Sequence, residues 1–230
     1  MPNSHHSLTP PPSGVGAAQH KGTGLLHVIE ALGAIPDARK HVQKDLWHYL
    51  DGQILPSGWY PERHYGLLLE ALASALDPKA VGGNVWHFIG RTAAKRDLAG
   101  APTAAPASNR PGGSGLYRAF VKEAASEASA FFLRAKKLWH LHHDTGEWEL
   151  LRRVERDATV VLRLTGFRFA VESMEQMYEA YLLEFASLSG VDMASRLTMS
   201  PRRGDAHYEW DHTLTPSTQT AEWLQTLPEA

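Results

Sequence analysis

The C-terminal third of the sequence constrains the fold more than any other stretch, because two predicted hairpins flank one predicted helix. Alternating apolar and polar residues predict four strands, at residues 147–154, 158–164, 193–199 and 207–214. Ser173 and Gln176 have the spacing of a capping box at the start of a helix, and Gly190 is suited to end it. This ββαββ unit predicts an α+β fold in which helices pack on a four-stranded, largely antiparallel sheet.

Earlier in the chain, apolar residues recur at helical spacing. The predicted helices span residues 25–33, 38–50, 61–76, 80–98 and 116–141. Asp37 is predicted to cap the second of them. Gly90 lies inside the fourth, where glycine costs about 1 kcal/mol relative to alanine, so we expect close packing at that point.

The composition of three segments suggests a single domain with irregular flanks. Residues 1–23 are rich in Pro, Ser, Gly and His and predict a disordered tail. Residues 24–214 form the predicted domain, interrupted by a Pro- and Gly-rich stretch at 99–115 that predicts a mobile loop. Residues 215–230 are predicted to be a C-terminal tail with one short helix at 221–227.

Charge and cysteine content exclude several classes of function. The net charge of −2 lacks the basic surplus of a general nucleic-acid or anionic-membrane binder. The absence of cysteine excludes disulfides, thiolate catalysis and cysteine metal sites. No apolar run approaches the roughly 20 residues of a membrane span, and the N-terminus lacks the pattern of a signal peptide, so we expect a cytoplasmic protein.

Several short motifs in a fixed order resemble a paralogous family of myxobacterial proteins. They are Trp59-Tyr60-Pro61, Ile89-Gly90-Arg91, the run from Leu162 to Phe167, and the run from Arg203 to Trp210. That family is similar to a superfamily of 4-vinyl-reductase-like domains, haem–nitric-oxide-binding domains and TRAPP-type tethering subunits. The resemblance implies a helix-plus-sheet fold with an apolar cavity between helices and sheet, and a role in sensing or scaffolding. The cysteines that the small-molecule branch often carries near the last hairpin are missing here, which argues against thiol-based sensing or metal binding.

The first functional expectation is a non-enzymatic sensor or regulatory domain that binds a small apolar molecule or a lipid. No Walker loop, dinucleotide-binding glycine motif, zinc-protease motif or nucleophile elbow is present, so we expect no enzymatic activity. Aromatic and methionine side chains at the helix–sheet junction are the candidate cavity lining, although the same residues suit a packed core. These ligand-binding candidates are Trp86, Trp139, Met177, Tyr178 and Tyr181.

Two alternative functions are a sensor that binds a metal ion or haem through histidines, and a scaffold that self-associates through an apolar helix face. His140, His143 and Asp144 have i, i+3, i+4 spacing and form a candidate site for zinc, iron or copper, although histidines also suit an exposed helix end. Haem is the other candidate cofactor, with His64, His87 or His140 as axial ligand, but the Tyr-x-Ser-x-Arg motif of haem-binding relatives is absent. A self-associating scaffold, such as a homodimer, is the third hypothesis.

Overall fold

The computed structural model describes residues 18–99, 127–167, 171 and 173–230. Residues 1–17 of the predicted tail, residues 100–115 of the predicted loop and residues 116–126 of the predicted fifth helix lie outside this part of the chain. Within it, no helix is both long enough and apolar enough to cross a membrane.

A four-stranded antiparallel sheet organises the C-terminal half. Its strands are β3 (Glu147–Arg152), β4 (Thr159–Thr165), β5 (Met193–Met199) and β6 (Tyr208–Leu214). They lie in the order β3-β4-β6-β5, and each pairs antiparallel with its neighbour. The predicted α+β architecture is confirmed, with each strand boundary within two residues of its expected position.

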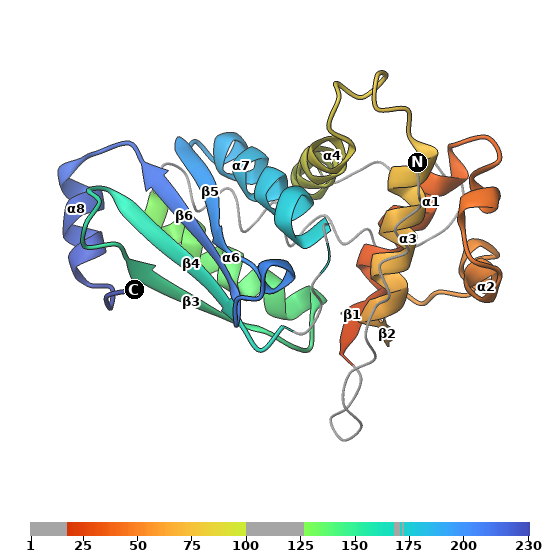
Figure 1. Ribbon diagram of the computed structural model, residues 1–230, viewed down its shortest axis with the longest axis horizontal. Coiled ribbons are helices and arrows are strands. Elements are labelled where there is room, and N and C mark those ends of the chain that lie inside the picture. The colour runs from red at the N-terminus through yellow and green to blue at the C-terminus, as the bar shows by residue number, and fades with distance from the viewer. Residues whose placement is uncertain (1–17, 100–126, 168–170, 172) are drawn as a thin grey trace.

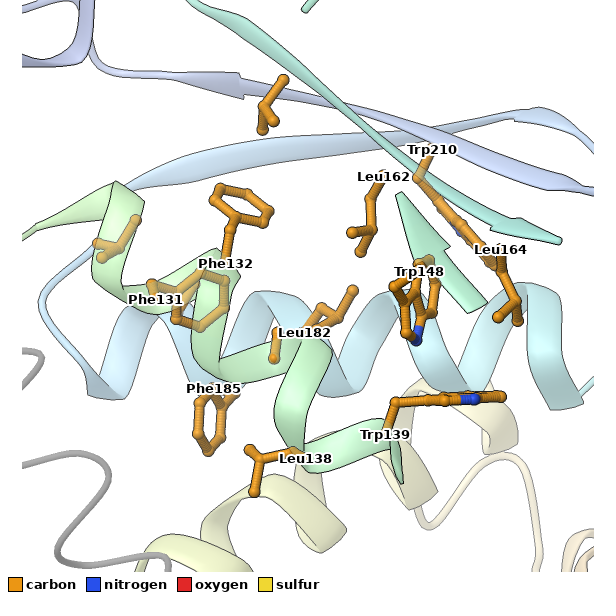
Figure 2. Close-up of a cluster of buried hydrophobic side chains, with 14 of the residues drawn as sticks. Phe131, Phe132, Leu138, Trp139, Trp148, Leu162, Leu164, Leu182, Phe185 and Trp210 are labelled. Carbon is orange, nitrogen blue, oxygen red and sulfur yellow. The ribbon is translucent and has the colours of Figure 1, made fainter. Parts of the chain in front are cut away.

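Helices α6 (Ala128–His142) and α7 (Tyr178–Leu188) contribute to the apolar core on one face of this sheet. Alternate residues of the strands point toward the helices, so Trp148, Leu162 and Trp210 meet Phe131 and Leu182 in the core (Figure 2). Each of these five side chains is at most 1% exposed. This burial is the main apolar contribution to holding the sheet and its helices together.

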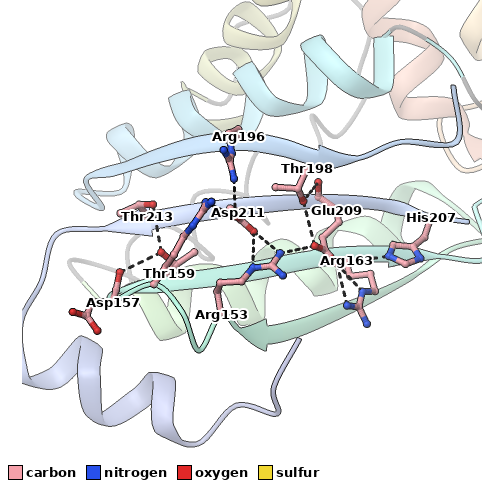
Figure 3. Close-up of polar contacts among 11 residues, drawn as sticks. Arg153, Asp157, Thr159, Arg163, Arg196, Thr198, His207, Glu209, Asp211 and Thr213 are labelled. Carbon is pink, nitrogen blue, oxygen red and sulfur yellow. Dashed lines mark hydrogen bonds and ion pairs between the residues drawn. The ribbon is translucent and has the colours of Figure 1, made fainter. Parts of the chain in front are cut away.

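The opposite face of the sheet carries a charged network (Figure 3). Glu209 and Asp211 of β6 are each only 3% exposed, because arginine side chains cover them. Arg153 lies between the two carboxylates, at 2.5 Å from Glu209 Oε1 and 2.7 Å from Asp211 Oδ1. The alternation along β6 therefore buries an aromatic row on one face and an ion-pair row on the other.

Residues 215–230, which were predicted to be a tail with one short helix, pack against the rest of the protein. Helix α8 (Thr218–Gln225) starts three residues before the predicted helix, because Ser217 Oγ accepts a hydrogen bond from Thr220 N at 3.0 Å. Leu224 joins the core next to the sheet. Beyond α8, Arg152 N donates to Pro228 O at 2.8 Å, which fastens the end of the chain to β3.

The N-terminal half is mostly helical and has a core of its own. Helices α1 (Gly22–Gly33), α3 (Glu62–Ala75) and α4 (Val85–Ala99) surround it, and a two-stranded sheet of β1 (Gln19–Lys21) and β2 (Trp59–Pro61) lies at one end. The prediction missed both strands, and residues 18–23 are structured although the predicted tail included them. Strands of three residues are too short to show an alternating pattern.

The predicted helix at 38–50 is wrong for most of its length. Two 3₁₀ turns, Ala38–His41 and Lys44–Leu46, precede a single α-helical turn, α2 (Trp47–Leu50). Asp37 has φ +60° and makes no side-chain cap. Val42 is extended, and its carbonyl oxygen accepts a hydrogen bond from Trp47 Nε1 at 3.0 Å, which stabilises the break.

The helix predicted at 173–189 starts with a π-helical turn, Ser173–Met177, before α7 continues it. Gln176 Oε1 accepts a hydrogen bond from Asn84 Nδ2 at 2.9 Å, so this side chain joins two segments that are far apart in sequence. Gly190 has φ +77° after the helix, as predicted for a left-handed end. Helices α4 and α7 lie side by side between the sheet and helices α1 and α3 (Figure 1).

Candidate functional site

A cavity of about 380 Å³ lies where the N-terminal helices meet the helices that cover the sheet. Helices α1, α3, α4, α6 and α7 all contribute to its wall. Most of the wall is apolar, including Val28, Leu69, Leu72, Ile89, Leu138, Leu182 and Phe185. Its volume is within the range of about 300–1,000 Å³ typical of small-molecule sites. The cavity is therefore the candidate functional site.

Four of the five predicted ligand-binding residues line this cavity. Trp139 comes from α6, Met177 from the π-helical turn, and Tyr178 and Tyr181 from α7. Trp86 does not line it and instead packs, partly buried, on the core of the N-terminal helices. Among the described residues, none from β3, β4, β5 or β6 lines the cavity, so it lies between helices and not, as expected from the sequence, between the helices and the four-stranded sheet.

Trp139 is both a core residue and a cavity residue. It is 3% exposed, and its ring contacts those of Trp148 and Tyr178 edge to face. Its Nε1 donates a hydrogen bond to Thr145 O at 2.9 Å, and its ring stacks on His143 at 3.7 Å. These contacts fix the end of α6 where the chain turns into β3, and they fix the cavity wall at the same point. Figure 2 shows Trp139 on α6 near Trp148 of β3.

One side of the cavity carries a polar group of four residues. Tyr181 Oη donates to Asp97 Oδ2 at 2.9 Å, and burial raises the pKa of Asp97 to about 6. Burial, followed by the nearby Arg96, lowers the pKa of His27 to about 4, so its imidazole is neutral at physiological pH. Arg96 is already paired with Glu30. This side therefore offers a neutral imidazole and a carboxyl group that titrates near neutral pH.

A second polar part of the wall contains three histidines, His20, His142 and His143, near the end of α6. His142 lines the cavity, and burial, followed by the neighbouring His20 and His143, lowers its pKa to about 3. Burial likewise lowers the pKa of His20 to about 4. A neutral imidazole carries a lone pair on one ring nitrogen, and this is the form of histidine that binds metal ions.

His20, Glu62 and His143 form a buried cluster beside the cavity. Glu62 Oε2 lies 3.0 Å from His143 Nδ1 and 3.5 Å from His20 Nδ1, and the two nitrogens are 3.4 Å apart. The three side chains are at most 9% exposed. Burial alone raises the pKa of the Glu62 carboxyl, but the adjacent His143 and His20 outweigh it and lower the pKa to about 2. Glu62 is therefore a carboxylate at neutral pH.

The metal site predicted within one stretch of sequence is not assembled in the structure. His140 is exposed on the other side of α6, where its Nε2 lies 3.4 Å from Glu147. Asp144 is exposed and accepts a hydrogen bond from Gln19 N at 2.6 Å. Only His143 enters a group that could hold a metal ion, because α6 ends at His142 and the following residues leave the helical spacing.

None of the three predicted haem ligands lines the cavity. His64 Nδ1 is 2.8 Å from Tyr49 Oη in the N-terminal half, and His87 and His140 are exposed. The histidines on the cavity wall are His20, His27, His142 and His143.

Sequence reasoning missed His20, His27, Glu62 and His142. His20 fell in the predicted disordered tail, and Glu62 follows Pro61 at a helix start, where an acidic residue is expected to face solvent. The burial of Glu62 follows from its contacts with β1 and the end of α6, which no local pattern reveals.

Comparison with solved structures identifies similar folds. The structure of a doubly substituted Tt H-NOX has a TM-score of 0.52 and 10% sequence identity, covering 85% of this chain and 95% of that one. An H-NOX domain from Shewanella oneidensis in the Fe(II)CO state has a TM-score of 0.46 and 12% identity, covering 84% and 98%. The first comparison shows that this chain shares its fold with that H-NOX structure. A comparison with protein-family models finds no match, and neither does one with curated proteins.

Proposed function

We propose that this chain is a non-enzymatic sensor domain that binds haem in the cavity between its helical half and its sheet half. The observation that carries the proposal is His142, a neutral imidazole on the wall of a mostly apolar cavity. Haem proteins commonly hold the iron with one histidine inside an apolar pocket. The fold is shared with an H-NOX domain, and another H-NOX structure concerns heme distortion, which names the group to test first.

The residues on the wall fit this group in two respects. His142 would bind the haem iron, and the apolar side chains of α4 and α7 would surround the porphyrin. Arg96 is the candidate partner for a propionate group, and its present partner Glu30 lies on α1. Bound haem supplies an iron centre with a position open to a small gas molecule.

The two walls of the cavity belong to different halves of the protein, so a bound ligand would contact both halves. His142 is the last residue of α6, and two residues of the sheet-side core, Phe131 and Phe132, come from the same helix. The opposite wall comes from α4 and α1 in the other half. A ligand that bound one spacing of these walls better than another would shift the protein toward that spacing.

Absorbance titration with hemin tests the proposal. We expect one equivalent to bind with a sharp Soret band, and His142→Ala to lose that band or shift it to the position of a different ligand. His140→Ala is the matched control, because His140 lies two residues away but is exposed on the other side of the helix. A wild-type spectrum equal to that of free hemin would refute the proposal, and so would an unchanged spectrum in His142→Ala.

A second candidate ligand is a small apolar organic molecule or a lipid. The specific observation in its favour is that Arg96, the arginine on the described wall, is already paired with Glu30. A ligand without carboxylates would leave that ion pair intact. Native mass spectrometry of freshly purified protein distinguishes the candidates, because it reports the mass of any copurified ligand together with the oligomeric state.

A further inference from the structure

We infer that His20, Glu62 and His143 form a binding site for a divalent transition metal ion, with Zn²⁺ as the ion best suited to it. Two imidazole nitrogens and a carboxylate oxygen are ligands that zinc commonly takes. The inference does not rest on the proposed haem site, since it uses three residues other than His142.

The separations of the three ligand atoms match those of a tetrahedral site. Nδ1 of His20, Nδ1 of His143 and Oε2 of Glu62 are 3.0, 3.4 and 3.5 Å apart. A circle through three points with these separations has a radius of about 1.9 Å, slightly less than the zinc–ligand distance of about 2.0–2.1 Å. An ion at that distance from all three atoms lies just above their plane, as it does in a tetrahedron whose fourth position is open.

The main chain holds the three residues in place from three separate elements. His20 is in β1, Glu62 begins α3, and His143 follows α6. Glu62 N donates to Ala18 O at 2.8 Å, and Asp144 N donates to Gln19 O at 3.1 Å. Main-chain hydrogen bonds therefore hold the backbone in place next to all three ligands. This reduces the conformational entropy that the protein loses when an ion binds.

Aromatic stacking fixes the two rings. His20 stacks on Tyr65 with 3.7 Å between centroids, and His143 stacks on Trp139 at the same separation. A β-carbon on Gly24 would lie 2.1 Å from His20 Nε2, so the glycine leaves the room that this ring orientation requires. These stacked contacts hold both imidazole rings in the orientations that bring their Nδ1 atoms to Glu62.

The charge of Glu62 points to a cation independently of the geometry. The residue is 5% exposed, and within the described chain its only ion-pair partners are His20 and His143. Burying a carboxylate without a full opposite charge is costly. A divalent ion in the triangle neutralises the carboxylate, whereas without it two imidazole N–H groups would have to share one oxygen atom.

His20 and His143 also line the cavity, so the ion borders it. Three protein ligands with an open fourth position are typical of zinc sites that bind water or another exchangeable ligand. The site therefore joins β1, α3 and α6 at the boundary of the two halves, next to the place where a cavity ligand would lie.

Zinc titration of chelator-treated protein tests the inference. The sample carries no affinity tag, and His5 and His6 are replaced by alanine in every variant to remove adjacent histidines of the tail. We expect one zinc ion per chain by elemental analysis, with a rise in the unfolding temperature on adding Zn²⁺ alone. Glu62→Gln and, separately, His143→Gln should weaken binding by more than the roughly 10- to 100-fold that changes around a ligand cause.

Two controls separate this site from the proposed haem site. His140→Ala should retain zinc, and His142→Ala should retain zinc while losing the haem spectrum. Wild-type protein that binds no stoichiometric zinc would overturn the inference, even if a variant fails to fold. Equal zinc affinity in folded Glu62→Gln and wild type would also overturn it.

Discussion

A β-carbon on Gly90 would lie 2.2 Å from the carbonyl oxygen of Met177, so α4 and the start of α7 approach as closely as only glycine allows. The sequence predicted close packing at Gly90, and this contact confirms it. Because Met177 and Ile89 both line the cavity, the same contact sets the width of the cavity between α4 and α7.

Gly90→Ala should therefore destabilise the protein although alanine favours helices. We expect the free energy of unfolding to fall by about 1–3 kcal/mol, as for other overpacked sites. The matched control is Gly66→Ala in α3, where an added β-carbon meets nothing within 4 Å, and which should gain up to about 1 kcal/mol. Urea denaturation measures both; a gain in stability at both positions would contradict the close approach.

His212→Leu should stabilise the protein increasingly as the pH falls. His212 is fully buried, and neither ring nitrogen has a hydrogen-bond partner among the described residues. Burial lowers its pKa to about 4, so between pH 6.5 and 4 the unfolded chain takes up a proton that the folded one does not. Wild-type stability therefore falls across that window, and this residue contributes a loss of about 2 kcal/mol between pH 7.5 and pH 5.

The measurement is the difference in unfolding free energy between His212→Leu and wild type at pH 7.5 and at pH 5. That difference should grow toward pH 5. His87→Leu, at an exposed histidine, is the control and should show no such growth. A difference independent of pH would show that His212 does not titrate in this way.

Glu209→Gln should destabilise the sheet at neutral pH and have less effect in acid. Burial alone raises the pKa of the carboxyl, but Arg153 and Arg163 outweigh it and lower the pKa. The stabilisation is thus present above the unfolded pKa of about 4.5 and is lost as the pH falls through the lower folded value. We expect a loss of about 2–3 kcal/mol at pH 7, less than for a fully buried pair because both arginines are partly exposed.

Thermal or urea unfolding at pH 7 and pH 3 measures this effect. Glu149→Gln is the control, since Glu149 is half exposed and lies 3.7 Å from Arg163. It should change stability by less than about 0.5 kcal/mol. Equal losses in the two variants at pH 7 would argue against a special role for the buried carboxylate.

Ala158→Gly should stabilise the hairpin between β3 and β4. Ala158 has φ +52°, a conformation that costs a residue with a side chain about 1–2 kcal/mol, and its carbonyl oxygen accepts a hydrogen bond from Leu214 N at 2.8 Å. Part of the gain is offset by the greater freedom of glycine in the unfolded chain, so we expect about 0.5–1 kcal/mol. Ala206→Gly, at an exposed position without positive φ, should lose stability in the same urea assay.

The sequence by itself determined the sheet and the helix that crosses it. Period-two alternation over β4 and β6 reflects a sheet with one face against helices, and that requirement acts within a few residues. The left-handed end at Gly190 is equally local, since it depends on one residue without a side chain. The cavity position was also predictable in part, because Tyr178 and Tyr181 belong to a recognisable apolar stripe.

Only the tertiary structure decided which polar residues meet. Glu62 lies 42 positions after His20, and His143 lies 81 positions after Glu62. Each has an ordinary local explanation: His20 in the predicted tail, Glu62 at a helix start and His143 near a helix end. The stretch His140 to Asp144 looked like a metal site because its spacing assumed that the helix continued. The chain leaves the helix after His142, which turns His143 toward β1 and leaves His140 in solvent. Local spacing determines which residues share a face, whereas the packing of distant elements determines what that face meets.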